Sequence, residues 1–305
     1  MRACPIIILT VCFLSLTSCF TGIESTPRIT DKEVRRNVPD VNVEAETAAL
    51  LAPDPMPRWQ PGRRFLVSDP KISLLFEKEP AISVGEILVF ESLTGDASIT
   101  GDSISVLTFR RADSAPSDEP LRYKLGIAPS ALADAATLPM SVDLAMVDNA
   151  RDLLAGKRFY ITSSMRVDKS LTPTGRGRKY VPVTITDVNA GNADYPLRLD
   201  ITDDLGQSSS IAMTVGTARS STRNFDKIFV IDDPRLRYPA ITEATWQNIA
   251  NSRVVAGMTP QECRLALGTP NDIRKWHNGG SFFESWACDN GQYLIFIDGL
   301  LAEIH

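Results

Sequence analysis

The sequence contains little of what catalysis or metal binding requires. Its 305 residues include only two histidines, His277 and the C-terminal His305. His277 lies in a Trp-His-Asn-Gly-Gly segment typical of a turn, and no nucleophile elbow or other catalytic partner motif accompanies it. Zinc-ligand spacings, phosphate-binding loops and haem motifs are also missing. We therefore expect a protein that is not an enzyme, with no catalytic residues, no metal site and no cofactor.

Positive charge and long apolar runs are scarce as well. The chain has 37 acidic and 32 basic residues, a formal net charge of −5, which argues against nucleic acid as a partner. After the first 18 residues, no apolar run approaches the roughly 20 residues that a membrane-spanning helix needs. The sequence therefore predicts that the rest of the chain does not cross a membrane.

The N-terminus has the layout of an export signal. Arg2 is followed by an apolar run from Pro5 to Leu14 and then by the segment Leu16-Thr-Ser-Cys19. This ending resembles the lipobox of bacterial lipoproteins, which implies cleavage before Cys19 and a diacylglycerol thioether on its thiol. Two or three acyl chains hold a protein durably on a bilayer, at ~0.8 kcal/mol per buried CH₂ group. We therefore predict a signal peptide over residues 1–18 and a lipid-anchored mature protein.

Composition divides the mature chain into segments. Residues 19–61 are polar and rich in proline and form a predicted lipidated tether, with room for a short helix near Val43 to Leu51. Residues 62–128 and 156–237 contain short β-branched runs separated by turn residues, which indicates two small β-barrel, SH3-like domains. Residues 129–155 have helical spacing broken at Pro139 and form a predicted helical linker.

Residues 238–305 have a different pattern. Thr242 and Thr259 are expected to cap two helices, the second with a capping box completed by Glu262. Asn290-Gly291 is the pair favoured in type I′ hairpin turns and separates two apolar strands. A strand near Ile273 to Trp276 precedes them, which gives an expected order of two helices and three antiparallel strands (ααβββ).

This C-terminal pattern resembles a known family. Gly257-Met-Thr259, Leu267-Gly-Thr-Pro270, Asn290-Gly291 and an aromatic strand ending in Asp298-Gly299 are similar to the module of the SmpA/OmlA (BamE) lipoproteins. The resemblance covers about residues 241–301. It implies a two-layer ααβββ domain and an accessory role in outer-membrane protein assembly and envelope integrity. The expected fold class is thus mainly β, with a C-terminal α+β module.

Two smaller features have alternative interpretations. Cys263 and Cys288 are the only thiols left after removal of the signal and lipidation of Cys19. In an oxidising compartment they either form a disulfide or pack separately as small apolar side chains. The basic segment from Arg176 to Lys179 either contacts an anionic lipid or glycan or is simply an exposed hairpin.

Location and function follow from these features. Phe20 follows the lipid cysteine where an aspartate favours inner-membrane retention in some bacteria, so we expect the outer membrane, on its periplasmic side. The main hypothesis is a periplasmic protein–protein scaffold or accessory in outer-membrane assembly, whose partners are other envelope proteins. The alternative hypothesis is a lipoprotein whose SH3-like domains bind peptidoglycan or another glycan.

Overall fold

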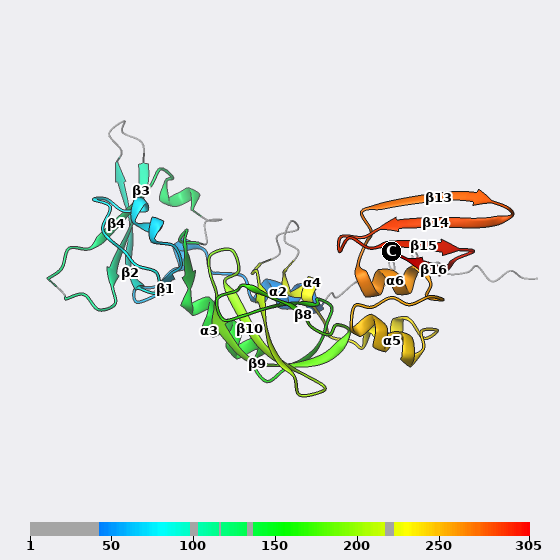
Figure 1. Cartoon of the computed structure of the whole chain (residues 1–305). Coiled ribbons are helices and arrows are strands. Elements are labelled where there is room, and N and C mark those ends of the chain that lie inside the picture. The colour runs from blue at the N-terminus through cyan, green and yellow to red at the C-terminus, as the bar shows by residue number, and fades with distance from the viewer. Residues whose placement is uncertain (1–42, 98–102, 116, 133–136, 217–222) are drawn as a thin grey trace, which may run out of the picture. The chain divides into compact units, whose positions relative to one another are not determined.

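The computed structural model describes residues 43–97, 103–115, 117–132, 137–216 and 223–305 (Figure 1). The predicted signal peptide, Cys19 and the first part of the predicted tether lie outside the described residues. Within the described residues, no helix combines the length and apolar character that crossing a membrane requires. The fold is mainly β, as expected, and its strands form three antiparallel sheets.

The first sheet has five strands in the order β4-β3-β2-β1-β5. Its strands are β1 (Arg64–Val67), β2 (Ile87–Ala97), β3 (Ser103–Arg111), β4 (Leu121–Leu125) and β5 (Ser141–Asp143). Short 3₁₀ helices lie at Met56–Arg58, Pro70–Leu75 and Pro129–Ala131. The core is aromatic: the Phe109 ring packs edge-on against those of Phe65 and Phe90 at centroid distances of 5.8 and 5.7 Å. Such pairs add to the stabilisation from burial alone.

The second sheet has seven strands in the order β12-β6-β9-β10-β11-β7-β8. They are β6 (Arg158–Ile161), β7 (Met165–Val167), β8 (Pro173–Arg176), β9 (Val181–Ala190), β10 (Leu197–Asp203), β11 (Ser208–Met213) and β12 (Phe229–Val230). Strands β9 and β10 alternate buried and half-buried residues, the period-2 pattern of a sheet with one face on a core. Helices α2 (Val43–Leu50), α3 (Leu144–Leu154) and α4 (Phe225–Ile228) contribute side chains to that core.

The C-terminal domain packs two helices on a four-stranded sheet. Helices α5 (Glu243–Ala250) and α6 (Pro260–Leu267) precede β13 (Asp272–Asn278), β14 (Ser281–Ala287), β15 (Tyr293–Ile297) and β16 (Leu300–Ile304). The predicted caps are confirmed, because the Thr242 hydroxyl accepts from Thr245 N–H and the Thr259–Glu262 capping box is complete. The sheet order is β13-β14-β15-β16.

The expectation of closed barrels is wrong. Each β domain is an open sheet whose two terminal strands pair with one neighbour only, β4 and β5 in the first and β12 and β8 in the second. Closure of a barrel requires the two edges to pair with each other. The two edges of the second sheet also differ in length, because β12 has two residues and β8 has four.

The hairpins of the C-terminal sheet also differ from expectation. Asp298 and Gly299 both have positive φ, so the chain reverses in a two-residue turn and forms β16, a fourth strand where three were expected. At Asn290-Gly291 only the glycine has positive φ, so the expected type I′ turn is wrong. The Cys288 N–H instead donates to the Gln292 carbonyl across a three-residue loop.

Segments assigned to connections prove to be folded. Strand β5 and helix α3 both arise from the predicted linker, and they join the first sheet and the second core respectively. Helix α2, within the predicted tether, contributes Ala48 to the second core, and Trp59 is buried in the first. In these segments, a few apolar residues without a regular sequence spacing are still buried. They pack against apolar side chains that other parts of the chain contribute to the same cores.

Asp143 is a buried polar residue that connects these elements. It ends β5, and its carboxylate caps α3 by accepting from the Ala145 N–H at 3.0 Å. It also accepts from Arg63 Nε at 3.0 Å and pairs with the same guanidinium through Nη2. Both side chains are more than nine-tenths buried.

We expect Asp143→Ala to lower the free energy of unfolding by about 3 kcal/mol or more, because Arg63 then keeps a buried charge without its main partner and α3 loses its cap. Urea denaturation followed by far-UV circular dichroism measures this. Asp148→Ala is the matched control, since that half-exposed aspartate pairs with Arg151 at the surface and is worth less than about 1 kcal/mol. Equal losses from the two variants would contradict the role of Asp143.

Candidate functional site: the open face of the C-terminal sheet

The two faces of the C-terminal sheet have different surroundings. One face is covered by α5 and α6, whose Trp246, Ile249, Cys263 and Ala266 share a buried core with the strands. The strands contribute Trp286, Leu294, Phe296 and Leu301 to this core. Because side chains alternate along a strand, the intervening residues point to the opposite face, which neither helix covers. We call this the open face.

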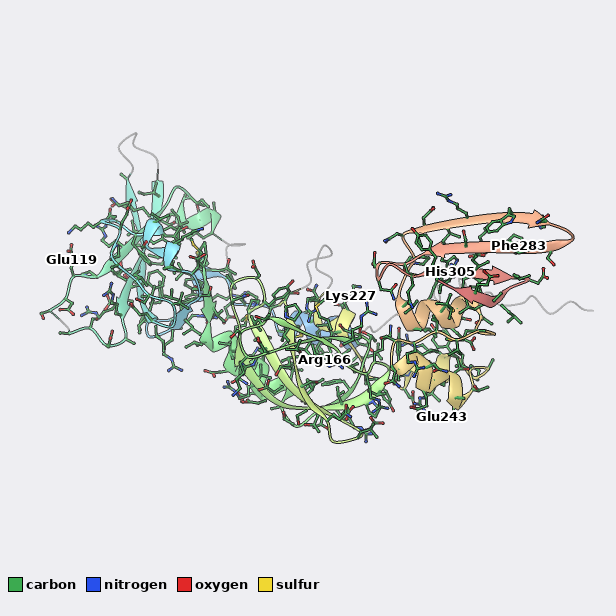
Figure 2. The ribbon with its side chains drawn as sticks, in the orientation of Figure 1. Glu119, Arg166, Lys227, Glu243, Phe283 and His305 are labelled. Carbon is green, nitrogen blue, oxygen red and sulfur yellow. The ribbon has the colours of Figure 1, made fainter. Side chains whose placement is uncertain are left out.

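A row of apolar side chains crosses all four strands on the open face. Trp276 pairs with Phe283, Phe283 with Ile297, and Ile297 with Leu300 in the strand register. Trp276 is 40% exposed and Leu300 is 51% exposed, whereas Phe283 and Ile297 are half-buried. We call these four residues the apolar row. Phe283 of β14, a member of the apolar row, is labelled in Figure 2.

The aromatic pair at one end of the row is ordered by stacking. The rings of Trp276 and Phe283 are nearly parallel, at 12°, with centroids 5.4 Å apart. Offset stacking of this kind holds two large side chains in one arrangement on the strand surface. Tyr293, 57% exposed, lies on the same face, four residues before Ile297 on β15. Clustered exposed aromatic and aliphatic groups on a rigid element are typical of protein-binding surfaces.

Polar contacts beneath the row stabilise the sheet. Glu284 is buried on the covered face, where it accepts from Trp286 Nε1 at 2.5 Å and pairs with Lys275 Nζ at 3.2 Å. The Arg264 guanidinium of α6 lies 4.7 Å from the centroid of the Trp286 ring. These contacts join β13, β14 and α6, so the open face is presented by a preorganised sheet rather than by loops.

One edge of the sheet is also exposed. Strand β13 pairs with β14 alone, and all seven of its residues are exposed. The free edge of such a strand presents unpaired N–H and C=O groups, to which another chain can add a strand. The open face and this edge adjoin at Trp276, so a partner can contact both.

Two aspartates of the acidic pairs Asp203-Asp204 and Asp232-Asp233 have local structural roles, and both histidines are exposed. Asp203 accepts from the N–H groups of Leu205 and Gln207 in a turn, and Asp233 caps a 3₁₀ helix (Pro234–Arg237). His305 Nε2 lies 3.1 Å from Glu303 Oε2 at the surface. His277 is exposed, its ring 5.1 Å from that of Phe282.

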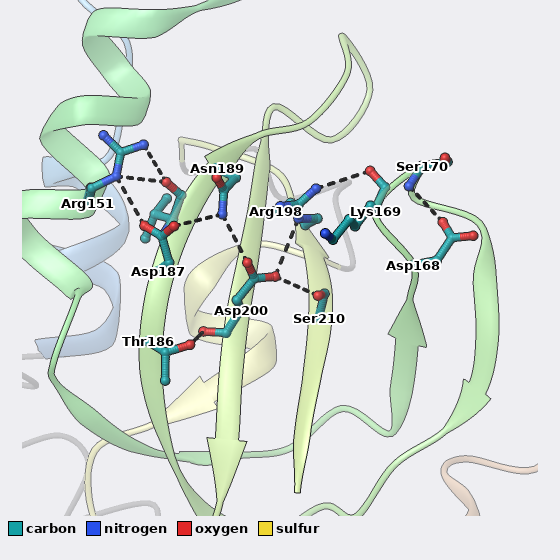
Figure 3. Close-up of polar contacts among 11 residues, drawn as sticks. Arg151, Asp168, Lys169, Ser170, Thr186, Asp187, Asn189, Arg198, Asp200 and Ser210 are labelled. Atoms are coloured by element: carbon teal, nitrogen blue, oxygen red, sulfur yellow. Dashed lines mark hydrogen bonds and ion pairs between the residues drawn. The ribbon is translucent and has the colours of Figure 1, made fainter.

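A polar network joins the strands of the second sheet to one another and to α3 (Figure 3). Asp200 accepts from Asn189 Nδ2 at 3.0 Å and from Ser210 Oγ at 2.6 Å, which ties β10 to both neighbouring strands. Arg151 of α3 donates through Nη2 to the Val188 carbonyl at 2.7 Å. These contacts hold strands and helix together. Across the described parts of the chain, no three histidine, cysteine or acidic residues are grouped so that they could hold a metal ion.

Cys263 and Cys288 are both buried, and in the structure both are free thiols. Burial, with smaller contributions from Glu262 and from Cys288 itself, raises the pKa of Cys263 to about 12. Burial also raises the pKa of Cys288, with a further contribution from Asp289. Both residues belong to the same buried core of the C-terminal domain, and their pairing stays a prediction.

We expect neither thiol of the reduced, native protein to react with iodoacetamide at pH 8, because the thiolate is the nucleophile and the raised pKa values keep both groups protonated. Both should react after denaturation in urea. Mass spectrometry counts the added groups.

The same measurement, made on protein isolated and denatured without reductant, tests the disulfide. If Cys263 and Cys288 are alkylated only after reduction, the result supports a disulfide between them. Full alkylation of both residues without reduction would rule the disulfide out. Rapid alkylation of the native protein would contradict the burial of the thiols.

Comparison with known proteins adds no assignment. No protein-family model matches the chain, and no curated protein matches its sequence. The apolar row was not anticipated from the sequence. Two features of the sequence could have predicted it. Side chains alternate between the two faces of β14, which places Phe283 opposite to the inward residues Phe282 and Glu284. The short turns then fix which residues of neighbouring strands pair.

Proposed function

We propose that the chain is a non-enzymatic, lipid-anchored accessory protein of the outer membrane that binds another envelope protein through the open face of its C-terminal sheet. The observation that carries this proposal is the apolar row, which crosses four paired strands and is covered by nothing in the described chain. A partner with a complementary apolar surface would remove Trp276 and Leu300 from water. Large aromatic side chains of this kind dominate the energetics of protein interfaces.

The sequence supplies the proposed location. The resemblance of Leu16-Thr-Ser-Cys19 to a lipobox supports attachment to a membrane through the Cys19 lipid, and Phe20 supports the outer membrane and its periplasmic side. The capped helix pair followed by an antiparallel sheet is compatible with a module of the SmpA/OmlA (BamE) type, to which a fourth strand is added. We propose that this module acts as a scaffold for other envelope proteins.

The glycan-binding alternative has less support. Glycan recognition by SH3-like domains, as hypothesised, uses exposed aromatic side chains as a platform. In the described residues of the two β domains, every aromatic side chain is buried or half-buried. The strongly exposed aromatic residues, Trp276 and Tyr293, lie instead on the C-terminal sheet, which favours protein binding over glycan binding.

Photocrosslinking in living cells tests the protein-binding function. We expect a benzoylphenylalanine placed at Trp276 or Leu300 to yield a covalent adduct with a membrane protein, because these positions would lie within the interface. Leu236 is the matched control, since it is apolar and 77% exposed but lies outside the open face. Adducts are separated by electrophoresis and identified by mass spectrometry.

A second control tests the anchor. Cys19→Ala removes the acceptor of the lipid and should abolish the adducts while leaving the protein folded. The proposal fails if the open-face positions give no membrane-protein adduct above the level seen at Leu236. It also fails if the adducts persist unchanged in the Cys19→Ala variant.

A further inference from the structure

A pocket of about 330 Å³ lies where the second β domain meets the C-terminal helices. The β domain contributes Ser164 and Met165, together with residues of the edge strand β8 and Lys179 after it. The C-terminal domain contributes Ser252, which follows α5, and Ala266 and Leu267 of α6. None of the described residues that line it is acidic, although the chain as a whole carries a net charge of −5. The pocket therefore concentrates positive charge, and it is separate from the open face.

Lys179 is a buried cation without a counter-charge. The residue as a whole is 7% exposed, and its side chain lines the pocket. No hydrogen bond or ion pair joins its ammonium group to a described residue, although that group is not among the fully enclosed polar atoms. The nearest favourable contact is with the Tyr180 ring, 5.5 Å from Nζ. Burial and the proximity of Arg176 lower the pKa of Lys179 to about 8. A charged group held in this way costs stability unless something pairs with it.

Ser252 supplies a second unsatisfied group in the same pocket. Its Oγ is buried and lacks a hydrogen-bond partner among the described residues. The backbone holds it there, because the Ser252 N–H donates to the Ile249 carbonyl at 2.9 Å in a tight turn after α5. The Lys179 N–H donates to the Ala250 carbonyl at 3.0 Å, which fixes the two stretches of chain against each other. A buried hydroxyl without a protein partner is uncommon, and Ser252 Oγ is thus free to bond to a group that enters the pocket.

The rim of the pocket is an exposed strand edge. Strand β8 pairs only with β7, with Gly175 opposite Arg166, and all four of its residues are exposed. Pro173 and Gly175 of this strand line the pocket. The outer edge of β8 can accept an additional antiparallel or parallel strand through its backbone groups. An extended chain added there would end beside Lys179.

We propose that this pocket binds the C-terminal carboxylate of an extended peptide, with Lys179 as its counter-charge, Ser252 as a hydrogen-bond donor and the free edge of β8 as the strand that pairs with the peptide backbone. A carboxylate fits because one buried ammonium balances one negative charge. Met165, Ala266 and Leu267 line the pocket with apolar surface suited to an apolar last side chain. Strand addition and capture of a terminal carboxylate are recurring modes of peptide recognition.

Equilibrium dialysis tests the proposal on the full-length chain in detergent micelles. The probe is a pool of N-acetylated pentapeptides whose last two residues vary among Ala, Val, Leu, Ile and Phe, made either as free acids or as C-terminal amides. Mass spectrometry quantifies each bound peptide. We expect the best-bound acids to exceed the amides of identical sequence by about tenfold or more, because the ion pair is lost on amidation.

Variants assign the effect to the pocket. Lys179→Met, which keeps the length and apolar stem of the side chain, should lower binding of the acids by about tenfold or more. Ser252→Ala should lower it several-fold and serves as a second test should Lys179→Met fold poorly by circular dichroism. Lys157→Met is the matched control, since Lys157 is exposed in the same β domain and lies outside the pocket, and it should bind as the native chain does.

Three results would overturn the proposal. The first is equal binding of acids and amides, and the second is unchanged binding in folded Lys179→Met and Ser252→Ala variants. The third is the absence of peptide binding together with Lys179-dependent binding of inorganic phosphate, which would make the pocket a phosphate site. None of these results bears on crosslinking at the open face, so the two proposals fail independently.

Discussion

The buried pair of Arg63 and Asp143 is the interaction on which the arrangement of the chain depends most. Arg63 stands just before β1, and Asp143 ends β5, which pairs with β1 in the first sheet. The same aspartate caps α3, whose Val147 and Leu154 pack in the core of the second sheet. One carboxylate thus satisfies a guanidinium and a helix N-terminus at once. A buried charge tolerates little displacement of its partners, so this pair fixes the point at which the chain passes from one core to the next.

The open face follows from a similar constraint, the alternation of side chains along paired strands. Once α5 and α6 cover one face of the C-terminal sheet, burial of Trp286 and Phe296 fixes which residues point inward. The remaining side chains of these strands then point outward, whether they are polar or apolar. A shift of the strand pairing by one residue would exchange the inward and outward side chains. That Trp276, Phe283 and Leu300 occupy outward positions in line with one another is therefore a property of the register. Folding does not require it, which is why we connect it with a partner.

The basic segment from Arg176 to Lys179 begins at the end of β8, and its charged side chains have different surroundings in the tertiary structure. Arg178 pairs with Asp203 and Asp204, so its charge is neutralised. Lys179 is buried without an acid, whereas Arg176 is exposed at the end of β8. Gly177 makes this possible, since a Cβ at that position would lie 2.4 Å from Nε of the buried Arg166. The sequence left open whether this segment contacts an anionic lipid or glycan or is an exposed hairpin. In the structure it contains one ion-paired, one buried and one exposed cation.

Features that depend on neighbouring residues could be predicted from local pattern. Capping of α5 and α6 by Thr242 and Thr259 and the strand-rich character of both middle segments depend on contacts within a few residues, and local pattern is enough to predict them. The open edges of the sheets could not be predicted from local pattern, because closure depends on whether two edges distant in the sequence can pair. The same holds for the burial of Ala48, Trp59 and the residues of α3 in the cores, and for the alignment of the apolar row. These outcomes rest on long-range packing, in which each side chain is buried or exposed according to what the rest of the chain places against it.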